Sequence, residues 1–190
     1  MFGLLENENP DAVELLKQDH DDVEEMFEEF QDAKEDENDE MKAALVMSIC
    51  RALTIHAQIE EEIFYPAMRT LEFDDARELA DEAAVEHATI RDLVSQLRSM
   101  RPGDDLFDAK VRVLAEYVKH HVREEESELF PDAKDSGLDL VALGRKIQMR
   151  KAHLEETRDA SPVRKPASAA RRRAPVSSRT RSTSRTTATK

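Results

Sequence analysis

The feature that most constrains the fold is a segment that occurs twice, 65 residues apart. Each copy places a histidine ten residues, and a glutamate six residues, before a proline. These residues are His56, Glu60 and Pro66 in the first copy and His121, Glu125 and Pro131 in the second. One further histidine precedes each copy, thirty-six and thirty-four residues upstream: His20 and His87. Such an internal repeat predicts two similar structural units.

Hydrophobic periodicity predicts that each unit is a helical hairpin. Apolar residues recur at spacings of three and four along four segments, a pattern typical of helices with one buried face. The segments start at about residues 9, 41, 74 and 104, and the last three end near Pro66, Met100 and Pro131. Asn9 is the expected first N-cap, with Pro10 at the first helical position. We expect an all-α fold, an antiparallel up-down-up-down four-helix bundle over residues 9–158, with an accessory helix within 138–158.

Each predicted stripe contains one histidine, and this arrangement indicates a metal site. Residues four apart on a helix share a face, so His56 and Glu60 point the same way, as do His121 and Glu125. Antiparallel packing brings a further imidazole from each side. The candidate metal ligands are His20, His56, Glu60, His87, His121 and Glu125. Buried carboxylates must be protonated, hydrogen-bonded or bound to metal, and imidazole with carboxylate suits iron, manganese or zinc.

Less specific interpretations of these residues remain open. One stripe histidine is more often a core residue than a ligand, and acidic runs are usually solvated. A metal-free structural bundle is therefore an alternative, although polar residues at core positions disfavour it. Tyr117, one turn before His121, is a candidate for a hydrogen bond to a metal-bound oxygen, or else a core residue. His120 and His153 are interpreted as non-ligands.

Several short motifs together resemble a known family. They are His56-x3-Glu60-Glu61 before Tyr65-Pro66, Glu86-His87, and His121-x3-Glu125-Glu126 before Phe130-Pro131. Over about residues 10–155 the sequence resembles the hemerythrin-like HHE cation-binding domain. The resemblance implies that two iron ions are bound, with terminal ligands His20, His56, His87 and His121 and bridging carboxylates Glu60 and Glu125.

The resemblance also sets expectations for function. Oxygen-carrying hemerythrin has a second histidine one turn after its third-helix ligand, where this chain has Arg91, so reversible oxygen transport is not implied. Ferritin-like proteins have the reversed Glu-x-x-His order, which argues against iron storage. Similarity to bacterial members implies an iron protein that binds or reduces oxygen, nitric oxide or peroxide, with an unknown redox partner or a slow peroxidase-like turnover. The alternative is a non-catalytic iron-binding or sensor module.

Charge and cysteine content add expectations about location and partners. Cys50 is the only cysteine, so an internal disulfide is excluded, and without a signal-like N-terminus or a long apolar run a cytoplasmic location is expected. All 42 acidic residues lie in residues 1–160, whereas residues 161–190 hold nine Lys or Arg. We expect residues 159–190 to form a disordered basic tail, which either contacts nucleic acid or anionic lipid weakly or only aids solubility.

Overall fold

The computed structural model describes residues 9–71 and 74–159, and within these ranges the regular structure is entirely helical. The long helices are α1 (Ala12–Glu35), α2 (Asp39–Ile59), α4 (Asp74–Leu97), α5 (Phe107–Glu124) and α7 (Leu140–Asp159). Two short helices are α3 (Tyr65–Met68) and α6 (Phe130–Asp135), and two π-helical segments are η1 (Glu60–Phe64) and η2 (Glu125–Leu129). The all-α prediction is confirmed, and the expected accessory helix is α7. The predicted basic tail lies outside the described residues.

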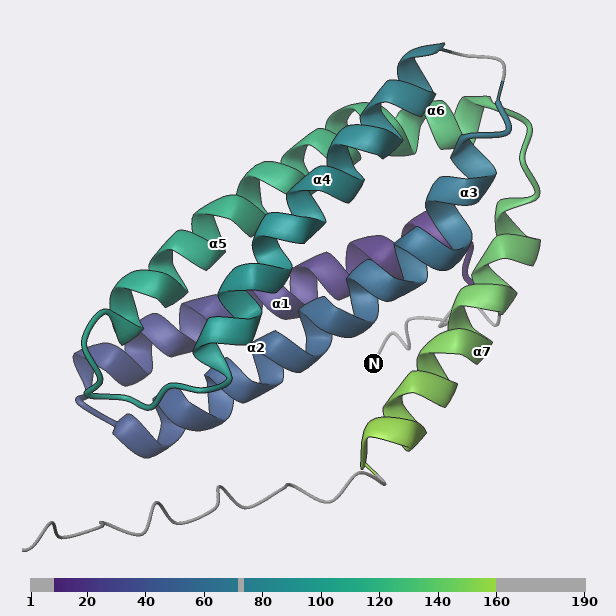
Figure 1. Ribbon diagram of the computed structural model, residues 1–190. Coiled ribbons are helices and arrows are strands. Elements are labelled where there is room, and N and C mark those ends of the chain that lie inside the picture. The colour runs from purple at the N-terminus through teal and green to yellow at the C-terminus, as the bar shows by residue number, and fades with distance from the viewer. Residues whose placement is uncertain (1–8, 72–73, 160–190) are drawn as a thin grey trace, which may run out of the picture. The chain divides into compact units, whose positions relative to one another are not determined.

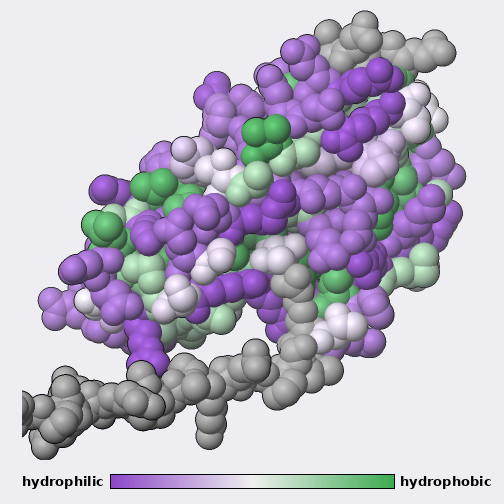
Figure 2. All heavy atoms as spheres, in the orientation of Figure 1, coloured by the Kyte–Doolittle hydropathy of each residue, from purple (hydrophilic) through white to green (hydrophobic). Residues whose placement is uncertain are grey.

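The long helices pack side by side around a common core. Contacts join α1 to α2, α4 to α5, α2 to α4 and α1 to α5, while α7 packs on α1 and α2 (Figure 1). Figure 2 shows that the visible face is mostly hydrophilic, with scattered hydrophobic side chains. Among the described helices, none combines the length and the apolar character needed to cross a membrane.

The start of α1 differs from the sequence-based expectation. The N-cap is Asp11 rather than Asn9, and Pro10 precedes the helix. The Asp11 carboxylate accepts a hydrogen bond from the Glu14 backbone N–H at 2.9 Å, and the Glu14 carboxylate accepts one from the Asp11 N–H at 3.0 Å. This reciprocal capping box satisfies two backbone donors, which a cap at Asn9 would not achieve.

The two repeat copies share an unexpected backbone feature. The second and fourth helical segments were expected to end near Pro66 and Pro131, but helical structure continues to Met68 and Asp135. Each proline is preceded by a π-helical segment, in which Tyr65 N–H donates to Glu60 O, five residues back, as the corresponding residue does in η2. The proline then falls in the first turn of the next helix, where a missing N–H is tolerated.

The buried core consists of two hydrophobic clusters separated by a polar layer. One cluster, which we call the proximal cluster, includes Leu16, Ile59, Phe64, Ala83 and Leu129. The distal cluster includes Val23, Phe30, Leu53, Ile90 and Val118. Along α1 and α4, residues of the proximal cluster come before the histidine and residues of the distal cluster come after it. Along α2 with η1, and along α5 with η2, the order is reversed. The change of cluster occurs at or close to the histidine in each case, so the four histidines lie between the two clusters.

Candidate metal centre

Six candidate ligands form the polar layer between the two clusters. Their relative exposures are between 0% and 5%: His20, His56, Glu60, His87, His121 and Glu125. The histidines meet in pairs, because His20 Nε2 lies 3.2 Å from His56 Nε2 and His87 Nε2 lies 3.1 Å from His121 Nε2. The structure therefore brings together every residue that the sequence predicted as a ligand.

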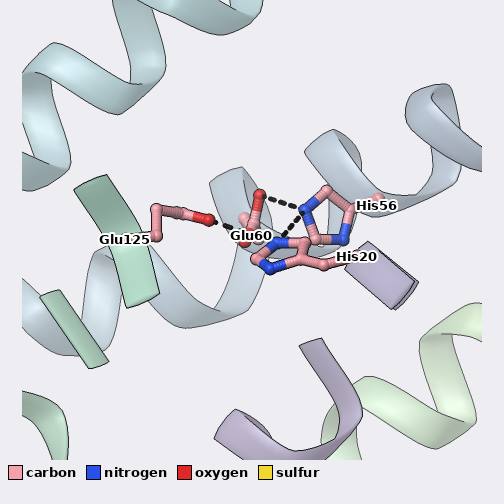
Figure 3. Close-up of side chains that lie close together, drawn as sticks. All are labelled: His20, His56, Glu60 and Glu125. Atoms are coloured by element: carbon pink, nitrogen blue, oxygen red, sulfur yellow. Dashed lines mark hydrogen bonds and ion pairs between the residues drawn. The ribbon is translucent and has the colours of Figure 1, made fainter. Parts of the chain in front are cut away.

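The two carboxylates lie between the histidine pairs. Glu60 Oε2 is 3.1 Å from His56 Nε2 and 3.2 Å from His87 Nε2, so this one oxygen reaches both pairs. Glu125 Oε2 does the same from the opposite helix, at 3.4 Å from His20 Nε2 and 3.5 Å from His121 Nε2. Figure 3 shows Glu60 and Glu125 converging on the first pair.

The donor set fits two neighbouring cations. Ligand atoms of His20, His56, Glu60 and Glu125 lie within 4.8 Å of one another, and those of Glu60, His87 and His121 form a second such group. Glu60 belongs to both. Within the part of the chain that the structure describes, its buried Oε1 has no hydrogen-bond partner. A buried carboxylate oxygen without a donor is costly unless a cation binds it, and imidazole with carboxylate is a donor set that suits iron.

Strong electrostatic coupling links the carboxylates to the imidazoles. Burial alone would raise the pKa of Glu60, but the neighbouring His56 and His87 hold that pKa well below its usual value. Burial would likewise lower the pKa of His56, yet Glu60 and the nearby Asp19 hold it well above the usual value. In the metal-free protein these shifts favour an imidazolium–carboxylate pair between His56 and Glu60, so a cation that binds His56 must displace its proton.

The outward-facing nitrogen of every histidine lies near a carboxylate from another helix. For the Nδ1 atoms the partners are Glu126 for His20 (3.0 Å), Asp19 for His56 (3.6 Å), Glu61 for His87 (3.1 Å) and Glu86 for His121 (2.9 Å). A carboxylate on the second nitrogen fixes the ring orientation and increases the basicity of the nitrogen that faces the metal. Hydrogen bonds to these carboxylates position the imidazoles of His20, His87 and His121, whereas His56 only faces Asp19 at 3.6 Å.

These outer carboxylates follow the same twofold pattern as the repeat. In sequence, each adjoins one of the six inner residues: Asp19 precedes His20, Glu86 precedes His87, and Glu61 and Glu126 follow the two inner glutamates. Each is also paired with a basic side chain: Lys17 with Glu126, Arg91 with Glu61, Lys151 with Asp19 and His120 with Glu86. The sequence interpretation did not assign a role to these four carboxylates, although a carboxylate beside four of the six candidate ligands was a visible signal.

Comparison with known proteins agrees with this geometry. The sequence model of the Hemerythrin HHE cation binding domain matches residues 11–133, which is more than half of the chain. The chain belongs to this family. As an HHE protein it contains, within the matched range, all six candidate ligands and the outer carboxylates Asp19, Glu61, Glu86 and Glu126. Helix α7 lies beyond the matched range.

Two relatives of this HHE protein show how far the similarity extends. A protein from Nostoc sp. strain PCC 7120 named DNA nickase is 35% identical over 119 residues, which cover 62% of this chain and 32% of that protein. The chain thus spans about a third of that relative. The crystal structure of an HHE cation binding domain-containing protein from Mycobacterium kansasii aligns with a TM-score of 0.66 and 24% identity, over 78% of this chain and 89% of that one. This second match shows a shared fold.

The tyrosine that lies at the candidate metal centre is Tyr65, not Tyr117 as the sequence suggested. Tyr117 is 45% exposed, because the buried line of α5 runs through Leu114, Val118 and His121 and leaves Tyr117 beside it. Tyr65 is fully buried instead and donates a hydrogen bond to Glu125 Oε1 at 2.7 Å. The contact that we expected from Tyr117 is therefore made by Tyr65, which occupies the position before the first repeat proline.

The two remaining histidines are exposed, and the cysteine is buried. His120 is exposed and pairs with Glu86 and with Glu124, while His153 lies on the exposed side of α7. Cys50 is completely buried in the distal cluster, and burial raises the pKa of its thiol to about 11. Cys50 is therefore a small buried hydrophobic residue of the core.

Proposed function

We propose that this HHE protein is a non-heme di-iron protein that binds or reduces a small oxidant, with oxygen, nitric oxide and peroxide as the candidates. His20 and His56 would hold one iron, His87 and His121 the other, and Glu60 and Glu125 would lie between the two. Iron would supply redox chemistry and coordination positions that the six protein ligands leave open.

The observation that carries this proposal is the buried inner layer. Two carboxylates and four imidazoles without cations would destabilise the core, and the unpartnered Glu60 Oε1 is the clearest sign that a cation completes the set. Every imidazole also has its outer nitrogen near a carboxylate, as metal-binding histidines almost always do. A structural bundle without metal would gain nothing from this arrangement.

A small cavity supports the choice of ligand size. It has a volume of about 10 Å³ and is lined by all four histidines together with apolar residues such as Val23, Leu53 and Ile90. A space of this size is close to the minimum for one water molecule. It suits only a very small ligand, and it is too small for larger organic substrates.

The alternative function is a non-catalytic iron-binding or sensor module. The same ligands would serve both functions, so a measurement of catalytic turnover distinguishes them. The activity named for the Nostoc relative is not part of our proposal, because the match covers only 32% of that protein. Weak nucleic-acid contact through basic residues 161–190 stays a prediction from the sequence.

The decisive experiment measures iron per chain and the visible spectrum after anaerobic reconstitution, before and after exposure to each oxidant. We expect two irons per chain in the wild-type protein and a large loss in Glu60→Ala, because Glu60 reaches both histidine pairs. His153→Ala is the matched control, since it removes an exposed histidine of α7. Absence of iron in the wild-type protein, or equal iron content in wild type and Glu60→Ala, would overturn the proposal.

A further inference from the structure

Helix α7 lies beyond the matched family domain, yet it contacts the shell around the candidate metal centre. Lys151 on α7 forms an ion pair with Asp19, the carboxylate that faces His56 Nδ1. The basic side chains that pair with the other three outer carboxylates come from helices of the bundle itself: Lys17 of α1, Arg91 of α4 and His120 of α5. One of the four outer carboxylates is therefore paired with a helix outside the matched domain.

The packing of α7 fixes where Lys151 lies. Leu143, Ile147 and Leu154 are buried in the proximal cluster, and Lys151 shares their face because it is four residues after one and three before another. Gly144 lies so close to the start of α1 that an added Cβ would be 2.4 Å from the backbone oxygen of Pro10. A larger residue there would force the helices apart.

The spacing of these contacts matches along both helices. Gly144 also approaches Ala12, and seven residues further on in each chain segment Lys151 meets Asp19. Seven residues are two helical turns, about 10 Å of rise. The close approach at Gly144 therefore sets the register that brings the ammonium group to the carboxylate.

Asp19 needs this cation more than the other outer carboxylates need theirs. It is 9% exposed, and its Oδ2 lies 3.6 Å from His56 Nδ1, the longest of the four outer distances. Within the described residues, His56 Nδ1 has no hydrogen-bond partner. A buried carboxylate that loses its cation turns toward water, and this movement would leave His56 without its positioning carboxylate.

We propose that docking of α7 is energetically coupled to metal binding. Lys151 holds Asp19, and Asp19 positions His56, so a docked α7 raises metal affinity and bound metal stabilises the docking of α7. This inference rests on the proposed metal site and adds its regulation. Coupling of this kind is reciprocal, because a helix that raises metal affinity must itself be held more tightly when metal is bound. A bidentate contact of Arg150 with Glu62, at 2.7 and 3.0 Å, also ties α7 to the segment that begins with Glu60.

The test combines metal affinity with backbone protection. Anaerobic Fe²⁺ affinity is measured by chelator competition, and hydrogen exchange of α7 amides is followed with and without Fe²⁺, in the full chain. We expect Lys151→Met to lower affinity by about 10-fold, the lower end for loss of a group that supports a metal ligand. In wild type Fe²⁺ should slow exchange in α7, and in Lys151→Met this response should disappear.

Matched variants separate positioning from folding. Lys146→Met removes the same charge from an exposed position of α7 and should behave as wild type, whereas Lys151→Arg should restore most of the affinity. Gly144→Ala should displace α7 and reproduce the loss of response by a different route. This inference alone would be overturned if wild type and Lys151→Met had equal Fe²⁺ affinity. It would also be overturned if Fe²⁺ did not change the hydrogen-exchange rates of α7 amides in wild type. A wild-type protein that binds no Fe²⁺ would overturn the proposed function as well.

Discussion

The two halves of the candidate centre are nearly identical on the inside and differ at the periphery. The Nε2 atoms of the two histidine pairs are 3.2 Å and 3.1 Å apart. On the outer side, a glutamate lies 2.9 Å from His121 Nδ1, whereas the corresponding aspartate lies 3.6 Å from His56 Nδ1. Aspartate is one methylene shorter than glutamate, and this accounts for the longer distance.

The residue before each repeat proline differs as well. Tyr65 lies with its ring centroid 5.6 Å from that of His87, and Phe130 lies 5.7 Å from that of His20. The two rings occupy equivalent places, but only the tyrosine carries a hydroxyl group, which donates to Glu125. The repeat thus preserves the ligand atoms while the surroundings differ, so the two halves should respond differently to matched substitutions.

The largest effect should come from removing one inner histidine of either half. We expect His87→Ala or His20→Ala to lower the metal affinity of its own half by more than about 100-fold, beyond the cost of losing an outer-shell partner. The other half should keep its metal, because in the proposed arrangement each histidine pair would hold its own ion. Metal content and chelator competition measure this, with His153→Ala as the control. Loss of all metal in both variants would show that the halves do not bind independently.

The next effect tests the hydroxyl group that only one half possesses. Tyr65→Phe makes the first copy resemble the second and removes the hydrogen bond to the buried Glu125 carboxylate. We expect a loss of about 1.5–3 kcal/mol in the free energy of unfolding, the range for a hydrogen bond to a charged group. Urea unfolding of the metal-free protein measures it. Tyr117→Phe, at an exposed position, should change stability by less than about 0.5 kcal/mol; a similar cost for both would contradict our assignment.

A smaller difference is expected between the two outer carboxylates. Glu86→Gln should lower metal affinity by about 10–100-fold, because Glu86 makes the shortest of the four outer contacts. Asp19→Asn should cost less, because Asp19 lies further from its histidine. Chelator competition on both variants, compared with wild type, ranks the two contacts. An equal or reversed order would mean that the 0.7 Å difference in distance has no energetic consequence.

Much of this centre could be predicted because its signals are local. The histidines and glutamates fall at helical spacings, so a stripe, a face and a repeat are readable from the sequence. The ends of the helices were harder to predict. The N-cap of α1 is Asp11 rather than Asn9, because Asp11 and Glu14 form a reciprocal capping box. Helical structure continues past Pro66, because a π-helical segment precedes this proline. Both outcomes depend on backbone geometry that periodicity does not encode.

The outer carboxylates and the tyrosine were missed for a different reason. Glu61 supports His87, and Glu126 supports His20, so each pairing connects helices that are far apart in sequence. A single helix wheel places these glutamates at the edge of a solvated face. Tyr117 was preferred because it precedes His121 by four residues, but the buried line of α5 passes through Val118 instead. Only the packed bundle decides which edge residues face the core.

The smallest effect should be shared equally by the two halves. Pro66→Ala and Pro131→Ala leave η1 and η2 with the same closing hydrogen bonds, from Tyr65 N–H to Glu60 O and from Phe130 N–H to Glu125 O. Each proline stiffens the unfolded chain at a position whose N–H is not needed, so each substitution should cost about 0.4–1 kcal/mol of unfolding free energy. Urea unfolding of the metal-free variants measures both. A gain of stability in one variant would show that its proline strains the π-helical segment, and the two copies would then differ in backbone as well as in side chains.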